Sequence, residues 1–435
     1  MRKATVSIQQ PVGWRPGEIA MLVNEGVVEQ HAEEAAFLWR LRRRAASEPH
    51  VGLMDLAALD RRVEANLSGL RVAGEHGWRS CRMGLERHGP GEVFALSVLA
   101  FASGDRKRMR DALYAACASP HLQAGLVSAL AWLEHDAVAP WLHALLESAA
   151  PEHRAIAVTA SALHHHDPGA SLAAAIDAED AALRACALRA AGQLKLHRLT
   201  GPVQAHLTDA APAARFWAAW SLTLLGHADG PTHLMAFADA PGPFAFQALQ
   251  LGLRALPLAH ARAWIRALAA RADTQRLTVL ATGIFGDAAS VPWLIQAMAD
   301  PQLCRLAGEA FTSITGVDLA YFDLVQTHSP PLGDDSEATP DPVLPPGHEA
   351  NLQWPAAALV AAWWNENAAR FAAGQRYTGG QPVSRAAAFE VLRKGRQRQR
   401  AGAALELACI DPQQALINVR EVGDRQLRRL ARWTS

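Results

Sequence analysis

Lysine and tyrosine are nearly missing from this 435-residue sequence. Lys3, Lys107, Lys195 and Lys394 are the only lysines among its 42 basic residues, and tyrosine occurs 3 times. Valine and isoleucine are also sparse beside alanine and leucine. Sheets draw on β-branched and aromatic residues, whereas alanine and leucine lose little side-chain entropy in helices. The composition therefore argues against a sheet protein and favours helix.

The sequence also lacks net charge, paired cysteines and long apolar runs. Its 42 basic and 42 acidic side chains balance, so the chain as a whole has no bulk attraction to nucleic acid or anionic membranes. The five cysteines are scattered singly, which is typical of reduced, buried thiols and not of a disulfide framework. No apolar stretch is long enough to span a bilayer. We expect a cytoplasmic protein with no membrane insertion.

What the sequence does contain is an internal repeat with a spacing of 29 to 31 residues. Each repeat has apolar residues at helical spacing in two successive segments, which predicts a pair of helices that pack inward. One column ends the first helix of each pair and should form a continuous buried ridge: Leu133, Leu163, Leu194, Leu225 and Leu256. The repeats start at or near these residues: His121, Glu152, Ala182, Ala213, Phe244, Thr274 and Leu303.

An aspartate in a turn, followed by an arginine early in the next helix, recurs along these repeats. The arginines are Arg154, Arg184, Arg215, Arg276 and Arg305. This pattern resembles the Asp/Arg ladder of HEAT repeats, specifically the short kind found in phycobilisome-lyase-like proteins, over residues 119–320. The resemblance implies an all-α fold, a right-handed α-solenoid of HEAT-like helix pairs with helical caps at both ends. In such ladders the arginines bind neighbouring turn carboxylates, and a basic groove for phosphate is the alternative.

The predicted organisation has four parts. Residues 1–118 form an N-terminal helical cap with degenerate repeats, and residues 119–326 form the repeat solenoid. Residues 327–350 are acidic and rich in proline, so we expect an extended or poorly ordered linker. Residues 351–435 form a C-terminal helical segment with a basic tail.

Five short stretches resemble an uncharacterised bacterial HEAT-repeat family that is encoded in type VI secretion gene clusters. They are residues 31–39 (HAEEAAFLW), 60–70 (DRRVEANLSGL), 315–319 (TGVDL), 362–364 (AWW) and 395–400 (GRQRQR). The resemblance implies an association with type VI secretion. It implies no catalytic residues.

His164, His165, His166 and Asp167 are the candidate metal ligands. Three imidazoles and a carboxylate could bind zinc or a redox metal. However, consecutive residues point in different directions, and this run falls in the turn between two helices. No second cluster with metal-ligand spacing follows nearby, so a structural role is the simpler interpretation.

The C-terminal tail is the one basic region. Residues 381–435 contain eleven basic and five acidic side chains, a net charge of +6. Arg396, Arg398 and Arg400 belong to the first of its two basic runs and are candidate partner-binding residues. Three interpretations are open: a solvated helix face, a clasp on the acidic linker, or a docking site for an acidic partner or nucleic acid. Because no excess of basic residues occurs elsewhere, nucleic acid is the less favoured partner.

Trp293 and Gln296 are the other candidate partner-binding residues. They lie on a predicted second helix, and we expect second helices to line the inner curve of the solenoid. Tryptophan beside polar residues is typical of a binding hot spot. The sequence thus predicts a non-enzymatic protein-binding adaptor or scaffold without a cofactor. The alternatives are a metal-dependent enzyme that uses the His164–Asp167 cluster and a nucleic-acid-binding protein that uses the tail.

Overall fold

The computed structural model describes residues 23–239, 242–327 and 343–432, and these residues form an all-α structure. Within these ranges the only strands are β1 (Tyr377–Thr378) and β2 (Gln381–Pro382), which pair antiparallel. None of the helices in the described ranges combines the length and apolarity needed to cross a membrane. The helices are α1 (Glu25–Ala45), α2 (Leu53–Val72), α3 (Glu75–Gly84), α4 (Pro90–Ser103), α5 (Arg106–Cys117), α6 (Pro120–Trp132), α7 (His135–Leu146), α8 (Pro151–Leu163), α9 (Ala170–Ile176), α10 (Ala181–Gln193), α11 (Thr200–Ala205), α12 (Pro212–Leu224), α13 (Gly230–Met235), α14 (Ala245–Ala255), α15 (Leu258–Ala269), α16 (Gln275–Phe285), α17 (Val291–Ala297), α18 (Cys304–Thr315), α19 (Ala357–Asn367), α20 (Arg385–Lys394), α21 (Gln397–Ile410) and α22 (Gly423–Arg432).

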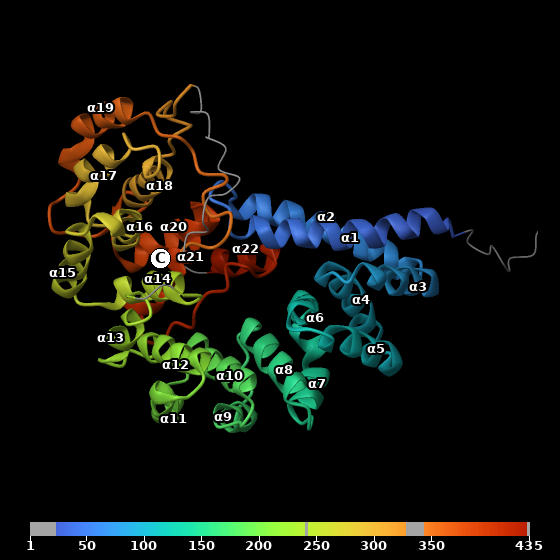
Figure 1. Cartoon of the computed structure of the whole chain (residues 1–435). Helices are drawn as coiled ribbons and strands as arrows, with labels where there is room; N and C mark the ends of the chain where they lie inside the picture. Colours follow the sequence, from blue (N-terminus) through green and yellow to red (C-terminus); the bar gives the residue numbers. More distant parts are fainter. Residues whose placement is uncertain (1–22, 240–241, 328–342, 433–435) are drawn as a thin grey trace, which may run out of the picture.

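From α4 to α18 the chain alternates between an inner and an outer row of helices (Figure 1). Each even-numbered helix in this range packs against the next even-numbered one, so α4 to α18 form a continuous inner row. Each odd-numbered helix from α5 to α17 packs against the even-numbered helix that follows it. Neighbouring pairs therefore bury each other's apolar faces, which a single pair could not bury alone.

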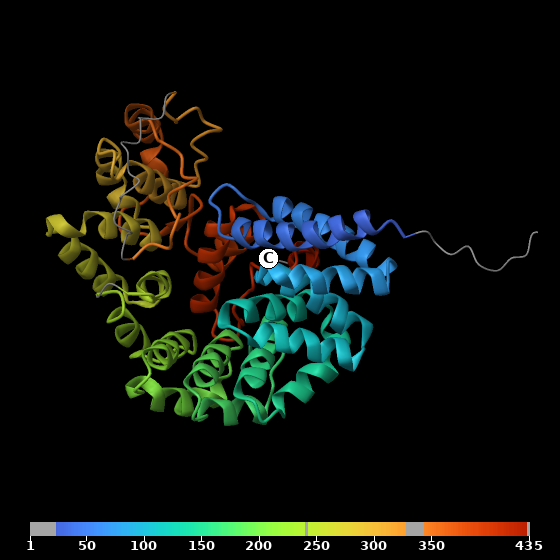
Figure 2. The same ribbon diagram turned by 45° about the vertical axis from the view of Figure 1, so that its right-hand side comes forward.

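The stacked pairs follow an arc, and the end of the chain lies inside this arc (Figure 2). Helices α20, α21 and α22, drawn in red, occupy the middle, while α1 and α2 lie at one end of the arc and α16 to α18 at the other. Among the packed pairs are α2 with α22, α14 with α21, and α18 with β1. The C-terminal residues thus connect the two ends of the arc.

The even-numbered helices are the first helices of the predicted repeat. From α6 to α18 they start within one residue of the expected positions. Several starts have a local cause, because Pro120, Pro151 and Pro212 occupy the first turn, where a missing N–H costs no hydrogen bond. The side chain of Asp180 caps α10 by accepting from the N–H of Leu183 at 2.8 Å.

The ends of three inner helices share one backbone motif. Beyond α8, α10 and α12, the residues His165, Lys195 and Gly226 have left-handed φ values of 57°, 55° and 77°. In each case two backbone N–H groups bond back to the last turn, for example from His166 to the carbonyl of Ser161 at 2.9 Å. This is a Schellman motif, which satisfies carbonyls that the helix leaves unpaired.

The leucine column corrects one sequence expectation. Leu225 is 6% exposed, but Leu133, Leu163, Leu194 and Leu256 are only half-buried, so the predicted ridge is not continuously buried. All five leucines stand at the last residue or the C-cap of their helices, where a side chain is less covered than in the helix interior, and only Leu225 is buried there. The fully buried positions lie earlier in each helix.

Most of the predicted linker, residues 328–342, lies outside the described residues. Its far end is packed against the protein. Leu344 is 9% exposed. The side chain of Glu349 accepts a hydrogen bond from Arg276, and its backbone carbonyl accepts one from Arg305 at 2.9 Å. Residues 343–350 are therefore in contact with the repeat region.

Candidate functional site

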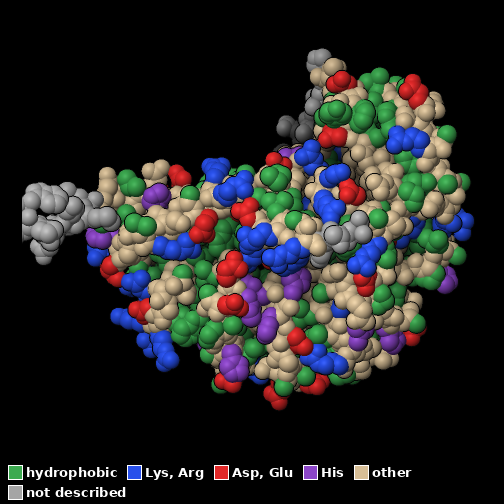
Figure 3. Space-filling model, turned by 180° about the vertical axis from the view of Figure 1, so that it is seen from behind, with side chains coloured by type: hydrophobic (Ala, Val, Ile, Leu, Met, Phe, Trp, Pro, Cys, Tyr) green, Lys and Arg blue, Asp and Glu red, His purple; other side chains and the backbone are tan. Residues whose placement is uncertain are grey.

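The histidine cluster lies at the turn that ends α8. His164 is the C-cap residue and His165 has the left-handed conformation of the Schellman motif. The rings of His164 and His166 both contact the ring of His135, with centroids 5.4 Å and 4.5 Å from it. Figure 3 shows histidine side chains gathered on the face seen from behind, next to a group of lysine and arginine side chains.

The first two imidazoles are each bonded to another part of the chain. Nε2 of His164 donates to the carbonyl of Leu130 at 2.9 Å. Nε2 of His165 lies 3.0 Å from Nη1 of Arg429 and must accept, because a guanidinium only donates. Burial, and then the charge of Arg429, lowers the pKa of His165 to about 4, and burial also lowers the pKa of His164. Neither Nε2 is therefore available to a metal without breaking a bond.

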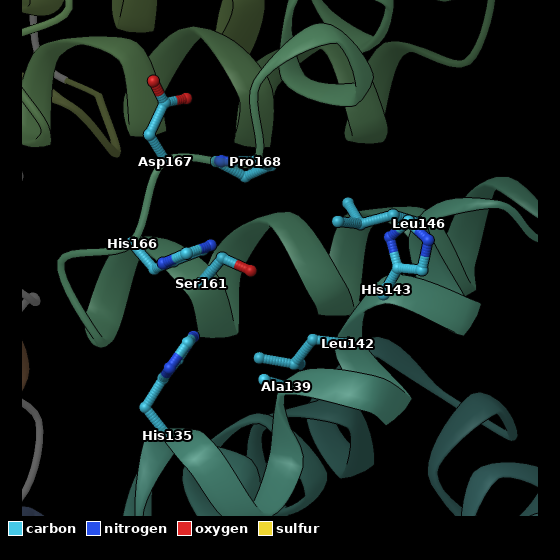
Figure 4. A pocket seen from close by; sticks show the side chains of 9 residues that line it. All are labelled: His135, Ala139, Leu142, His143, Leu146, Ser161, His166, Asp167 and Pro168. Atoms are coloured by element: carbon cyan, nitrogen blue, oxygen red, sulfur yellow. The ribbon is translucent and has the colours of Figure 1, made fainter.

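The third imidazole and the carboxylate face different neighbours. The ring of His166 packs on the ring of His135, with centroids 4.5 Å apart. The carboxylate of Asp167 points away from these rings (Figure 4) and binds Arg198 at 2.9 Å. Among the described residues, no three His, Cys, Asp or Glu side chains come together as a possible metal site. A small open pocket of about 110 Å³ lies beside the turn; its lining residues are His135, Ala139, Leu142, His143, Leu146, Ser161, His166, Asp167 and Pro168.

Trp293 and Gln296 lie on α17, in the outer row of helices (Figure 1). The second helices were expected to line the inner side of the arc, but they form its outer row, because the first helices pack against one another on the inner side. Gln296 is exposed, whereas Trp293 is half-buried and packs on the apolar cluster around α16 to α19. The structure brings both residues to one outer surface.

Arg396 and Arg398 are both bonded to other parts of the chain. Arg396 is partly exposed and pairs with Asp318 at 3.3 Å. Arg398 donates to the carboxylate of Glu309 at 2.8 Å and to the backbone carbonyls of Ser47 at 2.8 Å and His348 at 2.6 Å. The contact with His348 joins the tail to the end of the predicted linker.

Arg400 is fully buried, with 0% exposure. It donates to the carbonyl of Leu392 at 2.8 Å, to the side-chain oxygen of Gln426 at 2.5 Å and to that of Gln397. Burial lowers the pKa of this guanidinium to about 10. Its assignment as a partner-binding residue is therefore wrong, since no partner can reach it. Its charge serves to bind three oxygens inside the protein.

Cations also cover the C-terminal ends of inner helices. Arg425 donates to the carbonyls of Ala131 at 2.8 Å, Leu133 at 3.0 Å and Trp132, at the end of α6. A helix leaves its last carbonyls unpaired and carries partial negative charge at that end, so a cation there is stabilising. In the same way Arg376 donates to the last carbonyl of α16, that of Phe285, at 2.7 Å.

Backbone groups of the C-terminal segment bind two further helix ends. The N–H of Tyr377 donates to the carbonyl of Gly286 at 2.7 Å, just beyond α16. The N–H groups of Gly379 and Gly380 donate to the carbonyls of Ser313 and Ile314, each at 3.0 Å, in the last turn of α18. Residues 376–380 therefore bind the arc through hydrogen bonds to carbonyls that its helices leave unpaired.

One pair of the Asp/Arg pattern, Arg184 with Asp209, joins two neighbouring repeats. Arg184 binds both oxygens of Asp209, at 2.6 Å and 2.9 Å, and these bonds hold the pKa of that carboxyl well below its usual range. Arg215 instead donates to backbone carbonyls of the turn before its own helix, those of Asp209 at 2.6 Å and Ala210 at 2.9 Å.

Sequence reasoning missed that the tail is an interior element. A signal was present in α21, where Gln397, Arg400, Ala404 and Leu407 recur at helical spacing and all are buried. Polar residues that continue an apolar stripe indicate a buried hydrogen-bonded network. The basic composition of the tail concealed this pattern.

Comparison with known proteins adds no relative, since neither a family model nor a curated protein matches this chain.

Proposed function

We propose that this chain is a non-enzymatic adaptor or scaffold, a right-handed HEAT-type α-solenoid that binds another protein through its outer row of helices. The observation that carries the proposal is the occupied interior. Because α20 to α22 fill the inner side of the arc, the exposed positions of the odd-numbered helices are the extended surface left for a partner. The resemblance to a family encoded with type VI secretion systems supports a secretion component or its cargo as that partner, in a bacterial cytoplasm.

The other two functions have less support. A metal-dependent enzyme would need the imidazoles of His164 and His165, whose Nε2 atoms are already bonded to Leu130 and Arg429. Nucleic-acid binding would need exposed cations in the tail. Arg400 is fully buried and Arg425 is bonded to the end of α6, so binding would depend on exposed cations such as Lys394 and Arg428.

The test is affinity capture from the native host, with mass spectrometry, using the full chain and matched variants. Gln296→Arg changes the exposed surface of α17, and Trp293→Glu with Gln296→Glu changes it further. Gln204→Arg places the same change on α11, a distant helix of the same outer row. A partner that is lost with the α17 variants and kept with Gln204→Arg supports the surface near Trp293.

Circular dichroism shows whether each variant is folded. A partner retained by all variants moves the interface away from α17. If no partner is enriched over an unrelated bait in any sample, the adaptor function is contradicted.

A further inference from the structure

The first helix has an exposed face that nothing in the described chain covers. Its opposite face, with Leu38 and Trp39, is buried against the rest of the protein. On the outer face, Phe37 is 56% exposed and Leu41, one turn later, is 39% exposed, and Val27 on the same stripe is 46% exposed. Figure 1 shows α1 and α2 side by side along one edge of the molecule. A second molecule can therefore approach this face.

The charges on this face change sign at its middle. Glu29 and Glu33 precede Phe37 and are exposed, whereas Arg40 and Arg44 follow it and are exposed. Along a helix, residues seven apart lie on the same flank, so Glu33 and Arg40 occupy one flank of the Phe37–Leu41 stripe. The face is thus acidic at one end, apolar in the middle and basic at the other.

Such a pattern is complementary to itself only when two copies run antiparallel. If a two-fold axis passes between residues 36 and 37, then Glu33 of one copy lies opposite Arg40 of the other. The two Phe37 side chains then meet beside the axis. A parallel pair would instead place acid against acid, and an isologous contact is the usual form of a homodimer.

We propose that α1 is a homodimerisation surface, on which a second copy of this chain binds antiparallel through Phe37 and Leu41, with Glu33 facing Arg40 across the two-fold axis. The partners that Glu33 and Arg40 have within the chain do not prevent this. Glu33 pairs with Arg87, and Arg40 pairs with Glu92 at 2.8 Å, but both Glu33 and Arg40 keep nearly half of their side-chain surface exposed. A single helix pair is at the small end of specific interfaces, so the dimer should be weak and depend on protein concentration.

The first experiment is sedimentation equilibrium of the full chain over a concentration series. The expected mass rises from 46.7 kDa toward twice that value, and added salt weakens the association by screening the charged flank. Phe37→Ser should raise the dissociation constant at least about tenfold, because each dimer loses two central aromatic contacts. Tyr114→Ser is the matched control, since Tyr114 is 85% exposed on α5.

The second experiment tests the register by oxidative cross-linking. Phe37→Cys places a thiol beside the axis and should form an intermolecular disulfide. Val27→Cys lies on the same stripe, yet its two copies would be about 28 Å apart in the antiparallel pair at about 1.5 Å per residue. The unmodified chain, with its five native cysteines, shows the background.

A chain that stays at 46.7 kDa throughout the series overturns the proposal. A dimer that is insensitive to Phe37→Ser would show that the interface does not include α1. Equal cross-linking of Phe37→Cys and Val27→Cys would show that the two helices are not antiparallel. If Phe37→Ser changes only the proteins captured from the host and not the mass, the face binds a different protein, and the homodimer is wrong.

Discussion

Arg42 and Asp60 form a buried ion pair, with 2.7 Å between Arg42 Nε and Asp60 Oδ1, and this pair binds the backbone of the C-terminal segment. Arg42 also donates to the carbonyls of Arg420 at 2.7 Å and Glu421 at 2.8 Å. Asp60 Oδ2 accepts from the N–H of Gly423 at 2.7 Å. The first two helices are thereby joined to the last one.

Asp60→Asn should destabilise the protein strongly. It removes the carboxylate and leaves the Arg42 guanidinium buried without its counter-charge, which typically costs about 3–5 kcal/mol. Urea unfolding measures the change, and hydrogen exchange should rise at residues 420–426. Arg61→Ala is the control, because the exposed pair of Arg61 with Asp424 should contribute less than about 1 kcal/mol. Similar effects of both variants would contradict the assigned role.

Arg425→Gln should cost about 2 kcal/mol of unfolding free energy, because it leaves the carbonyls at the end of α6 without a cation. The side chain of Arg425 is 12% exposed, whereas Arg428 on the same helix is 61% exposed. Arg428→Gln should therefore change stability by less than about 0.5 kcal/mol. Thermal unfolding of the two variants measures both effects. Equal losses of stability would exclude a capping role of Arg425 at the end of α6.

Stability should fall as the pH is lowered from about 6.5 toward 4. The pKa of His165 is about 4 in the folded protein, against 6.5 for an exposed histidine, so in this window the unfolded chain takes up a proton that the folded chain does not. The loss between pH 7.5 and 5 should be about 1–2 kcal/mol. His165→Asn removes this titration and tolerates the left-handed conformation. If the His165→Asn variant loses as much stability at low pH as the unmodified chain, His165 is not the cause of the loss.

Gly286→Ala should be more harmful than Gly104→Ala. Both glycines have left-handed φ values, 83° and 69°, so both substitutions cost about 1–2 kcal/mol of backbone strain. A Cβ at Gly104 meets open space, but one at Gly286 would overlap the carbonyl oxygen of Tyr377. We expect an additional loss of about 1–3 kcal/mol at Gly286. Chemical denaturation of both variants measures the difference in unfolding free energy. Equal losses would show that residues 376–380 do not bind the end of α16.

Purified protein should contain less than one equivalent of zinc, iron or copper by elemental analysis. The reason is that Nε2 of His164 and Nε2 of His165 are already hydrogen-bonded, and no three possible ligands come together among the described residues. Chelators should leave the melting temperature unchanged. If the protein contains one equivalent of metal that is lost on substituting His165 and His166 by alanine, the alternative function of a metal-dependent enzyme is supported.

The repeat was predictable because its signals are local. Helix starts at Pro120, Pro151 and Pro212 and the turn at Gly226 follow from short-range backbone preferences. The candidate site was less predictable. The sequence located the histidine turn, but it could not show that His165 accepts from Arg429, which lies 264 residues later.

Helicity and the spacing of the repeats were determined by the sequence alone, because backbone hydrogen bonds and side-chain contacts within a helix join residues three or four apart. Only the tertiary structure decided where the basic tail lies and what its side chains bind. Its bonds join distant parts of the chain, as when Lys195 donates to the carbonyl of Ala408 at 2.6 Å and Arg42 to that of Glu421. An arginine in the sequence suits solvent, a partner or an unpaired helix carbonyl equally well, and only the arc of helices brought those carbonyls to the tail.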